Sequence, residues 1–456
     1  MRVGSAPTVA EQAAREIARL SPAALTADLR RVAEDLVLDI FGLCLAARRS
    51  DYAQAALAGW DGDGDGTAIG HARRLSAAGA AFVNGTAAHG EDFDDTFEGG
   101  PVHAGAVVVP AVLAAAERFG ASGAQALLGI AVGVETICRL SLVAPRMVHK
   151  AGFHPTAVFG AMAAAAAVAA TLKLDEKQIV DAWGIAGSMA GGIIEYLADG
   201  SWTKRLHPGW AAQAGLHAAL LARAGFVGPR SVFEGTHGLF NGFAHSSAGD
   251  YTKLTGDFGR VWLAETLAFK AYACGTMAHP YIDCARRVAA QGVAADDITE
   301  ILCEVAEGTV HRLWEPLAAK QAPPNAYAAK FSVPFCIAVG FVTGDAGIAA
   351  FTEDTVADSR VRALAAKVRY VVDPDNPYPR RYTGHVRATL RDGRVVEERQ
   401  ADLRGGAKQP LPRAEIEAKF MANAAYGGWP KARAEAARDL ARRLFDDKID
   451  LSALRG

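Results

Sequence analysis

The chain of 456 residues is longer than one ordinary hydrophobic core, so its length predicts two or three domains. A hydrophobic fraction of 51% and a charged fraction of 21% are typical of a folded globular protein and exclude a disordered one. The 48 lysines and arginines nearly balance the 50 acids, and the formal net charge of −2 argues against a broad nucleic-acid-binding surface.

The N-terminal stretch is polar and helix-like, and it lacks the apolar core of a signal peptide. The six cysteines form no CxxC pair, which favours neither a zinc site nor a disulfide framework. No apolar run avoids charge and glycine for long enough to span a bilayer. We therefore expect a cytoplasmic, reducing location and neither a membrane nor a nucleic-acid partner.

Residues 8–48 predict two amphipathic helices, the second introduced by Thr26. Alternating aspartates and glycines in residues 61–66 predict a loop, which is no EF-hand because the acid spacing and the closing glutamate are wrong. Residues 74–90 are rich in small residues, a composition that suits closely packed helices. Ala-rich helices follow between residues 104 and 190, with Pro110 expected to kink the first of them.

The pattern changes after about residue 268. Runs of β-branched residues predict strands at 298–306 and 366–373, and a hairpin around Asp392-Gly393. Helical stretches lie between them, and the helical pattern returns from Arg413. The predicted fold class is mainly α with an α+β part. A helical domain (1–268) would be followed by an inserted, smaller α+β domain (269–408) and by C-terminal helices (409–456) that return to the helical domain.

Residues 91–103 gather five carboxylates, one threonine and one histidine within thirteen positions. Asp92 and Thr96, four residues apart, share a face on a helix or an irregular turn. His103 follows after a glycine-rich link. The alternative is that the aspartates cap helices and face solvent. We expect most of these acids to be helix-end or surface charges, with Asp92, Thr96 and His103 as the working part.

Three further segments place histidine or lysine at predicted helix starts or at the domain junction. His154 precedes a proline that begins an Ala-rich helix, although a histidine there can simply be exposed. Lys204 and His207 lie at another helix start, where they are placed to hold an anion unless they form only a solvated basic turn. Lys270 and His279 lie where the two domains are expected to meet, which is where pockets occur.

Together these segments predict one pocket with cations for carboxylates and an Asp/His pair for proton transfer. The sequence has no serine nucleophile elbow and no P-loop, and its glycine-rich AGSMAGG stretch follows no predicted strand. Metal-ligand spacing is also absent, so we expect chemistry without a metal or cofactor.

The chain resembles the MmgE/PrpD family, which includes 2-methylcitrate dehydratases, cis-aconitate decarboxylases and iminodisuccinate epimerase. The resemblance rests on segments that occur in the family's order: DFDDT with His103, GFHPT, TKRLHPGWAAQAG, FKAYACGTMAHPYIDCA and AKFSVPF. It implies a helical domain with an α+β lid domain, homodimers, and a cofactor-free active site between the two domains. Carried over by position, the family's active-site residues are Asp92, Thr96, His103, His154, Lys204, Lys270 and His279.

Two positions depart from the family pattern. Phe335 stands where relatives often have a tyrosine, so a phenolic proton donor is missing. Glu98 stands where relatives vary, and an extra acid near the site would disfavour a highly anionic substrate.

The family's reactions make or consume a carbanion next to a carboxylate, and such a carbanion needs cations beside it. We expect Lys204 and Lys270 to supply them, with Thr96 and His207 also binding substrate. His103 or His154 would be the general base, Asp92 would orient it, and His279 would be the second acid/base. The predicted function is a hydro-lyase acting on a small hydroxy-di- or tricarboxylate.

The alternatives are an epimerase or isomerase acting at the α-carbon of a dicarboxylate such as iminodisuccinate, and a catalytically silent family member. A zinc enzyme is a further possibility that the spacing of the histidines and cysteines disfavours.

Overall fold

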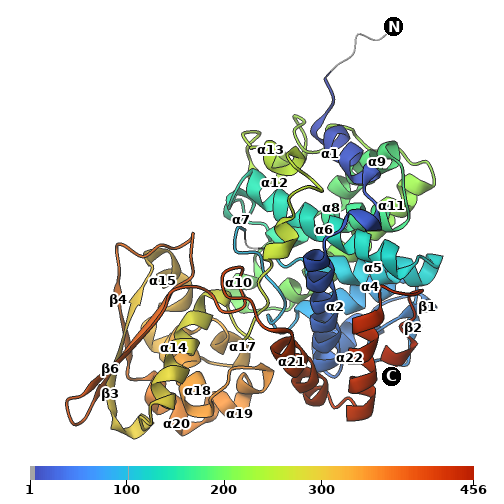
Figure 1. Cartoon of the computed structure of the whole chain (residues 1–456). Coiled ribbons are helices and arrows are strands. Elements are labelled where there is room, and N and C mark those ends of the chain that lie inside the picture. Colours follow the sequence, from blue (N-terminus) through green and yellow to red (C-terminus); the bar gives the residue numbers. More distant parts are fainter. Residues whose placement is uncertain (1–5, 101) are drawn as a thin grey trace. The chain divides into compact units, whose positions relative to one another are not determined.

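The computed structural model describes residues 6–100 and 102–456, which form two compact units (Figure 1). Unit 1 contains the described residues up to Gly90, Asp94–Leu267 and Arg413–Gly456. Unit 2 contains Ala268–Pro412 and the short segment Glu91–Phe93. This segment was expected inside the helical domain. It belongs to unit 2, where lysine side chains bind its two acids.

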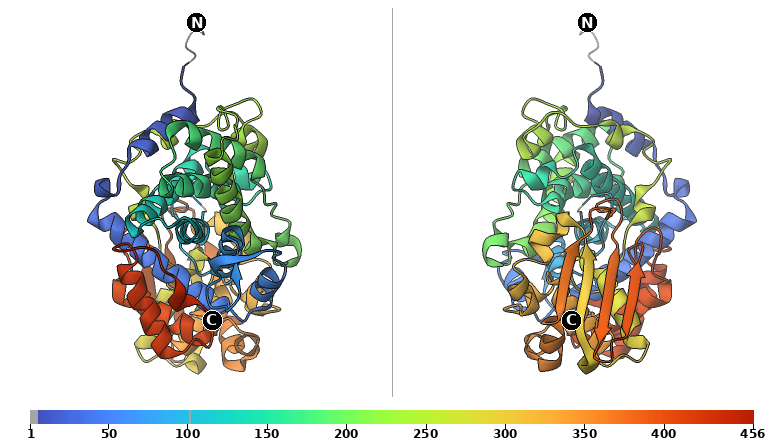
Figure 2. Two further views of the ribbon diagram at one scale, coloured as in Figure 1. Left: turned by 90° about the vertical axis from the view of Figure 1, so that its right-hand side faces the viewer. Right: turned by 90° about the vertical axis from the view of Figure 1, so that its left-hand side faces the viewer.

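Unit 1 is built mainly of helices (Figure 2, left). They are α1 (Val9–Arg19), α2 (Ala27–Ala47), α3 (Asp51–Ala58), α4 (Ala77–His89), α5 (Gly105–Phe119), α6 (Gly123–Val143), α7 (Met147–Lys150), α8 (Pro155–Thr171), α9 (Glu176–Met189), α10 (Tyr196–Asp199), α11 (Thr203–Arg223), α12 (Leu239–Ala244), α13 (Thr252–Thr255), α21 (Arg413–Tyr426) and α22 (Lys431–Arg443).

Local capping explains several helix starts. The predicted start at Thr26 is confirmed, because its hydroxyl accepts a hydrogen bond from the Leu29 amide at 3.0 Å. Reciprocal capping boxes start α1, α6 and α9.

Helix α8 is the centre of the unit 1 core, because all of its residues are buried. Its alanines allow neighbouring helices to approach closely. A Cβ atom at Gly129 of α6 would lie 2.7 Å from the Ala167 carbonyl oxygen, and one at Gly215 of α11 would lie 2.5 Å from that of Ala161. Small residues on both sides of a crossing therefore set the spacing of α6, α8 and α11.

Among the described residues, α6 is long and apolar enough to cross a membrane by length and composition alone. The sequence had led us to expect no apolar run long enough to span a bilayer, so this helix departs from that expectation. The helix is a core element, with 94% of its most apolar window buried. Glu135 and Arg139 of α6 are buried and form an ion pair of 2.5 Å.

Residues 61–66 were predicted to form a loop, and this prediction is wrong over most of the stretch. Strand β1 (Asp63–Thr67) pairs antiparallel with β2 (Arg74–Leu75). Its glycines permit the pairing, because a Cβ at Gly64 or Gly66 would lie 2.8 or 2.9 Å from the Leu75 carbonyl oxygen. The closeness of the two backbones explains why residues with low β propensity form a strand here.

Unit 2 combines a four-stranded sheet with helices (Figure 2, right). Its elements are α14 (His279–Ala290), β3 (Ile298–Val305), α15 (Glu307–Leu313), α16 (Leu317–Gln321), α17 (Ala326–Ala329), α18 (Val333–Thr343), α19 (Glu353–Ala357), α20 (Ser359–Ala365), β4 (Val368–Val372), β5 (Gly384–Leu390) and β6 (Val395–Gln400).

The sheet order is β4-β3-β5-β6, with β3 parallel to β4 and antiparallel to β5. The predicted hairpin is confirmed as β5 and β6, which pair Arg387 with Glu397. Helix α14 packs on β5 and β6, and α18 packs on α14. With unit 1 mainly helical and unit 2 mixed, the predicted class of a mainly α protein with an α+β part is confirmed.

The last two helices complete unit 1, and Figure 1 shows them in red beside the blue α2. Lys419 of α21 forms an ion pair of 2.8 Å with the buried Asp39 of α2. Phe420 is fully buried, and a Cβ at Gly42 of α2 would lie 3.1 Å from its ring. The core of unit 1 is therefore made from both ends of the chain.

Candidate active site

The acidic loop between α4 and α5 belongs to the interior and not to a solvated surface. Asp92, Asp94 and Asp95 are 4%, 0% and 0% exposed, so Asp94 and Asp95 are not the surface charges expected for most acids of this stretch. Pro101 of the glycine-rich link lies outside the described residues. Burial of three acids in one short loop requires partners for each of them.

Asp95 is a helix cap, although it lies ten residues before the helix that it caps. Its two carboxylate oxygens accept hydrogen bonds from the amides of Ala104 at 3.0 Å and Gly105 at 2.8 Å, at the start of α5. Burial raises the pKa of Asp95 to about 8, and the charge of Asp94 beside it acts in the same direction. The loop is thereby folded back onto the N-terminus of α5.

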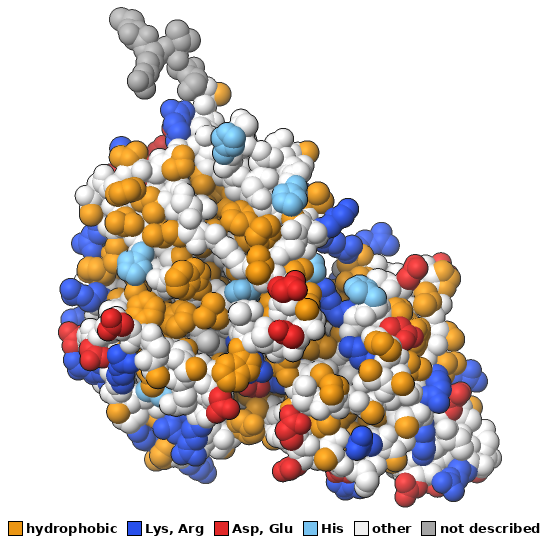
Figure 3. Space-filling view, turned by 180° about the vertical axis from the view of Figure 1, so that it is seen from behind, with side chains coloured by type: hydrophobic (Ala, Val, Ile, Leu, Met, Phe, Trp, Pro, Cys, Tyr) orange, Lys and Arg blue, Asp and Glu red, His pale blue; other side chains and the backbone are white. Residues whose placement is uncertain are grey.

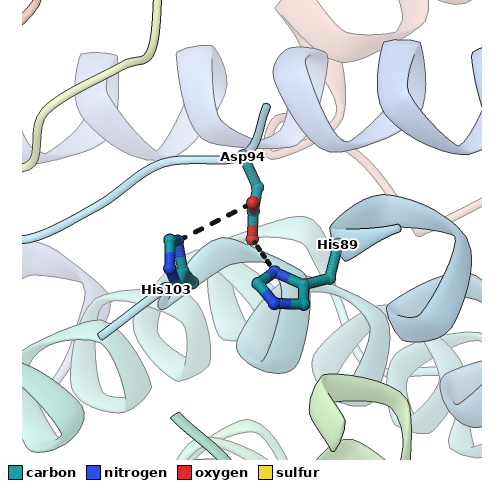
Figure 4. Close-up of side chains that lie close together, drawn as sticks. All are labelled: His89, Asp94 and His103. Carbon is teal, nitrogen blue, oxygen red and sulfur yellow. Dashed lines mark hydrogen bonds and ion pairs between the residues drawn. The ribbon is translucent and has the colours of Figure 1, made fainter. Parts of the chain in front are cut away.

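Asp94 joins two histidines, as Figure 4 shows. Its Oδ2 lies 2.7 Å from Nδ1 of His89, at the end of α4, and its Oδ1 lies 3.7 Å from Nδ1 of His103. The centroids of the two imidazole rings are 4.8 Å apart. One carboxylate therefore contacts a fully buried histidine and a second histidine whose side chain is 13% exposed.

The hydrogen bonds of His103 define its tautomer. Nδ1 lies 2.7 Å from the carbonyl oxygen of Asp95, which can only accept, so Nδ1 carries the proton. The backbone amide of His103 donates to the hydroxyl of the buried Thr156 at 3.2 Å, which fixes the backbone. In the neutral ring Nε2 is then left as the basic nitrogen, the state that a general base requires.

His154 and His207 extend the group of imidazoles. His154 is the N-cap residue of α8, as predicted from Pro155, but it is buried and not exposed. Its ring centroid lies 5.8 Å from that of His89 and 6.5 Å from that of His103, and its Nδ1 is 3.1 Å from Nδ1 of His207 on α11. We call His89, His103, His154 and His207 the histidine cluster.

Two members of the histidine cluster, His154 and His207, are neutral at neutral pH. Burial is the largest cause that lowers the pKa of His154 well below its ordinary value, and the pKa of His207 to about 4. The positive charge of Lys204 lowers the pKa of both, so this predicted substrate-binding cation lies near them. Neutral His154 and His207 can exchange hydrogen bonds, but they do not attract an anion by charge.

Close contact between α4 and α11 brings two members of the cluster together. A Cβ at Gly85 of α4 would lie 2.7 Å from the Cα of Gly209, and one at Gly209 would lie 2.1 Å from the Phe82 carbonyl oxygen. His89 follows Gly85 by one helical turn, and His207 immediately precedes the Pro208-Gly209 pair of α11. The small residues between positions 74 and 90 thus have the packing role that their composition predicts.

The remaining predicted site residues occur in both units. Thr96, in unit 1, is buried in the loop that carries Asp94 and Asp95. Within unit 2, Lys270 donates to the Asp92 carbonyl oxygen at 2.7 Å and to its carboxylate at 3.1 Å. Asp92 has a φ of 55°, a left-handed conformation that this double contact holds. The ammonium of Lys270 is therefore already engaged by a carboxylate.

His279, also in unit 2, is fully buried at the start of α14. Its Nε2 lies 3.3 Å from the Cys274 carbonyl oxygen, and its ring meets the Tyr272 ring at a centroid distance of 5.2 Å. Its Nδ1 has no hydrogen-bond partner among the described residues. Phe335, at the position where the resemblance predicts a tyrosine in many relatives, is buried in α18 beside Phe351.

Sequence reasoning missed His89, Asp94 and Thr156. His89 ends an Ala-rich helix that looks like simple packing, and Asp94 is one of several neighbouring acids. The available signal was the five-residue spacing of His89 and Asp94, but only the fold of the loop turns the carboxylate back toward the end of α4.

His89, Asp94 and His103 are also the described residues that could hold a metal ion. Their potential ligand atoms all lie within 4.8 Å of one another. Tetrahedral zinc with ligands at about 2.0–2.1 Å needs its ligand atoms roughly 3.4 Å apart. The contact of 2.7 Å between Asp94 and His89 is instead a hydrogen bond, so the three side chains fit a proton-transfer group better than a preformed metal site.

A pocket of about 570 Å³ opens beside the histidine cluster within unit 1. Its walls come from residues 191–210 and from Ala157, and His207 is the cluster member that lines it. This volume lies within the range of small-molecule sites.

Comparisons with known proteins agree with the resemblance seen in the sequence. The MmgE/PrpD N-terminal domain matches residues 11–251, and the MmgE/PrpD C-terminal domain matches residues 272–445. Cis-aconitate decarboxylase of Mus musculus is 31% identical over 369 residues, which cover 77% of this chain and 72% of that protein.

The protein of the same name from Homo sapiens is 31% identical over 366 residues, covering 77% of this chain and 73% of that protein. "Cis-aconitate decarboxylase-like protein oryM" of Aspergillus oryzae is 28% identical over 428 residues, covering 89% and 88%. Both domain models and these similarities lead to one conclusion: the chain belongs to the MmgE/PrpD family.

Proposed function

We propose that this protein is a cofactor-independent lyase of the dehydratase type that acts on a small hydroxy-di- or tricarboxylate. Family membership and the decarboxylases among its relatives support a decarboxylase- or dehydratase-like function. In the proposed reaction a base removes the proton α to a carboxylate, the bond from the β-carbon to the hydroxyl breaks, and the hydroxyl leaves as water after protonation.

The observation that supports this proposal most directly is the state of His103. Its Nδ1–H is held by the Asp95 carbonyl oxygen, and its partly exposed side chain offers Nε2 as the base. Lys204 is proposed to bind the carboxylate on which negative charge develops, and Thr96 and His207 to contact the substrate. The roles of Asp92 as orienting acid, Lys270 as second cation and His279 as second acid/base stay predictions.

A decarboxylase is the second candidate, because relatives in both mammals and fungi bear that name. In that reaction the bond to a carboxylate breaks, carbon dioxide leaves, and the same imidazole returns a proton to the carbanion. The two reactions share the need for a cation beside a carboxylate and for one acid/base group.

A panel of hydroxy-, amino- and unsaturated di- and tricarboxylates separates the possibilities. A dehydratase raises the ultraviolet absorbance of a hydroxy acid, whereas a decarboxylase releases carbon dioxide. An epimerase exchanges the α-hydrogen in heavy water without forming a double bond. We expect dehydration, and we expect His103→Ala to lower kcat by about 10²–10⁴-fold. If none of the three signals appears for any compound, the protein is not an enzyme of this type.

A further inference from the structure

The pocket beside the histidine cluster has an apolar wall. Ile193, Leu206 and Trp210 line it, and their side chains are 61%, 38% and 47% exposed. Leu197 and Trp202, also exposed, lie in the same stretch of chain. Figure 3, which views the protein from behind, shows hydrophobic side chains gathered on one face. A concave, apolar surface of this size is what a ligand of low polarity would bury.

The charged side chains that line the pocket are both acids, Glu195 and Asp199. Hydrogen bonds from Ser201 lower the pKa of the Asp199 carboxylate, so it is ionised at neutral pH. The imidazole of His207, also on the wall, is neutral because burial lowers its pKa to about 4. The pocket therefore repels an additional carboxylate and offers it no cation from its own walls.

The pocket is joined to the proposed reaction site through His207. Nδ1 of His207 lies 3.1 Å from Nδ1 of His154, the next member of the cluster. Gly192 lies between pocket and ring with a φ of 118°, and a Cβ there would be 2.5 Å from the Ala157 side chain and 3.3 Å from the His207 ring. Glycine thus allows the backbone to lie against His207 at the inner end of the pocket.

We infer that this pocket receives an uncharged, apolar substituent of the substrate. The substrate would then be a dicarboxylate that carries an alkyl or aryl group, in contrast to a tricarboxylate. This inference rests on the proposed function for the location of the carboxylates, which bind near the histidine cluster and Lys204. The apolar side chains of the pocket and its two acids would favour an apolar group over a third carboxylate as the remaining substituent of the substrate.

Binding of unreactive analogues tests the inference separately from catalysis. Saturated 2-alkylsuccinates lack the hydroxyl leaving group, and their Kd values for the full-length protein are measured by titration calorimetry from methyl to hexyl. Each buried methylene is expected to lower Kd by about fourfold until the pocket is filled. Propane-1,2,3-tricarboxylate, with a third carboxylate, is expected to bind at least about tenfold more weakly than 2-butylsuccinate.

The helix α11 offers a matched pair of variants. Leu206 lines the pocket and is 38% exposed, whereas Leu221 on the same helix is 37% exposed and does not line it. We expect Leu206→Asn to reduce the gain for each methylene to less than about twofold, while Leu221→Asn retains the wild-type series.

A wild-type series that does not bind, or that has one Kd at every chain length, overturns the inference. If Leu206→Asn instead changes the mass of the particle in sedimentation while the wild-type series stays flat, a second copy of the chain occupies the surface and the inference is wrong. Failure of the proposed function gives a different result. If Kd falls with each added methylene but no hydroxy acid is turned over, the pocket binds the apolar substituent and the protein is not a dehydratase.

Discussion

The two oxygens of Asp94 contact different histidines, and this arrangement links a buried ring to an accessible one. His89 and Asp94 are both buried, and a hydrogen bond of 2.7 Å joins them. If this bond were lost, no water could replace it, and the Asp94 carboxylate would be left without that partner. Asp95, its neighbour, uses its side chain for α5 and its carbonyl oxygen for His103. Adjacent aspartates thus have separate tasks, one electrostatic and one structural.

Asp94→Asn tests the electrostatic task. The amide retains the shape but removes a negative charge that favours a protonated imidazole. We expect kcat to fall by about tenfold or more with little change in KM, and the acidic limb of the kcat–pH profile to move to lower pH. Asp94→Glu should restore part of kcat and return the limb toward its wild-type position. If Asp94→Asn changes neither kcat nor the position of the acidic limb of the kcat–pH profile, the role of Asp94 is structural only.

Asp95→Asn tests the structural task through stability. The folded-state pKa of Asp95, about 8, lies above the ordinary value of 3.8, so the folded protein holds this proton more tightly than the unfolded chain. The contribution to stability is complete below about pH 4 and is lost as the pH rises through about 8.

The asparagine variant does not titrate at this position, so its Tm relative to wild type should rise from pH 5 to pH 9, by roughly 4 °C or more. Asp61→Asn, at an exposed position, is the control and should follow the wild-type curve. A constant difference between the Asp95→Asn variant and wild type over this pH range would contradict the assignment.

Helix α11 shows how packing between helices positions the chemistry. It meets α4 at Gly85 and Gly209, and these contacts are closer than any larger residue would allow. The helices therefore carry His89 and His207 toward the same cluster because small residues let their backbones approach. A change at the crossing should affect both stability and activity.

Gly209→Ala is the corresponding test. The added methyl group would lie 2.1 Å from the Phe82 carbonyl oxygen and 2.4 Å from the Thr86 hydroxyl, so α11 must move away from α4. We expect a loss of about 1–3 kcal/mol in the free energy of unfolding, together with a fall in kcat measured well below the Tm. Gly242→Ala, in α12 with no atom within 4 Å of the added methyl, should leave both quantities near wild type.

Regular elements with local signals were predictable from the sequence. The Thr26 cap, the start of α8 at Pro155 and the β5–β6 hairpin each depend on residues within a few positions of one another. Strand β1 was not predictable, because its glycines are suited to a strand only when β2 lies against them. The formation of β1 therefore depends on long-range packing against β2, which outweighs the low β propensity of its residues.

The candidate site divides in the same way. Helix starts identified His154, Lys204 and His207, and the structure brings His103, His154 and His207 together within unit 1. The burial of Asp94 and Asp95 could not be inferred, since it depends on a loop that returns to cap α5 from ten residues away. The hydrogen bond that fixes the His103 tautomer is a consequence of that same loop.

The two units are built differently from the chain. Unit 2 is continuous apart from Glu91–Phe93, whereas unit 1 is made from three separate stretches. The C-terminal stretch supplies α21, whose Phe420 is fully buried against α2. Stability of the helical unit therefore depends on residues that are more than 370 positions from α2 in the sequence.

Phe420→Ala measures that dependence. Removing a fully buried phenylalanine should lower the free energy of unfolding by about 3–5 kcal/mol, observed by urea denaturation of the complete protein. Phe226→Ala, at a position that is 59% exposed, should change it by less than about 0.5 kcal/mol. Equal effects of the two substitutions would mean that α21 contributes little to the core.

The order of the stretches also has a consequence during synthesis. A ribosome releases residues 268–412 before it has made α21 and α22, so the continuous part of the smaller unit can fold while the larger one still lacks its last helices. Until Arg413–Gly456 emerges, the apolar face of α2 that Phe420 covers stays uncovered on the nascent chain. A product that stops early would expose this face permanently, which makes it a natural substrate for chaperones and proteases.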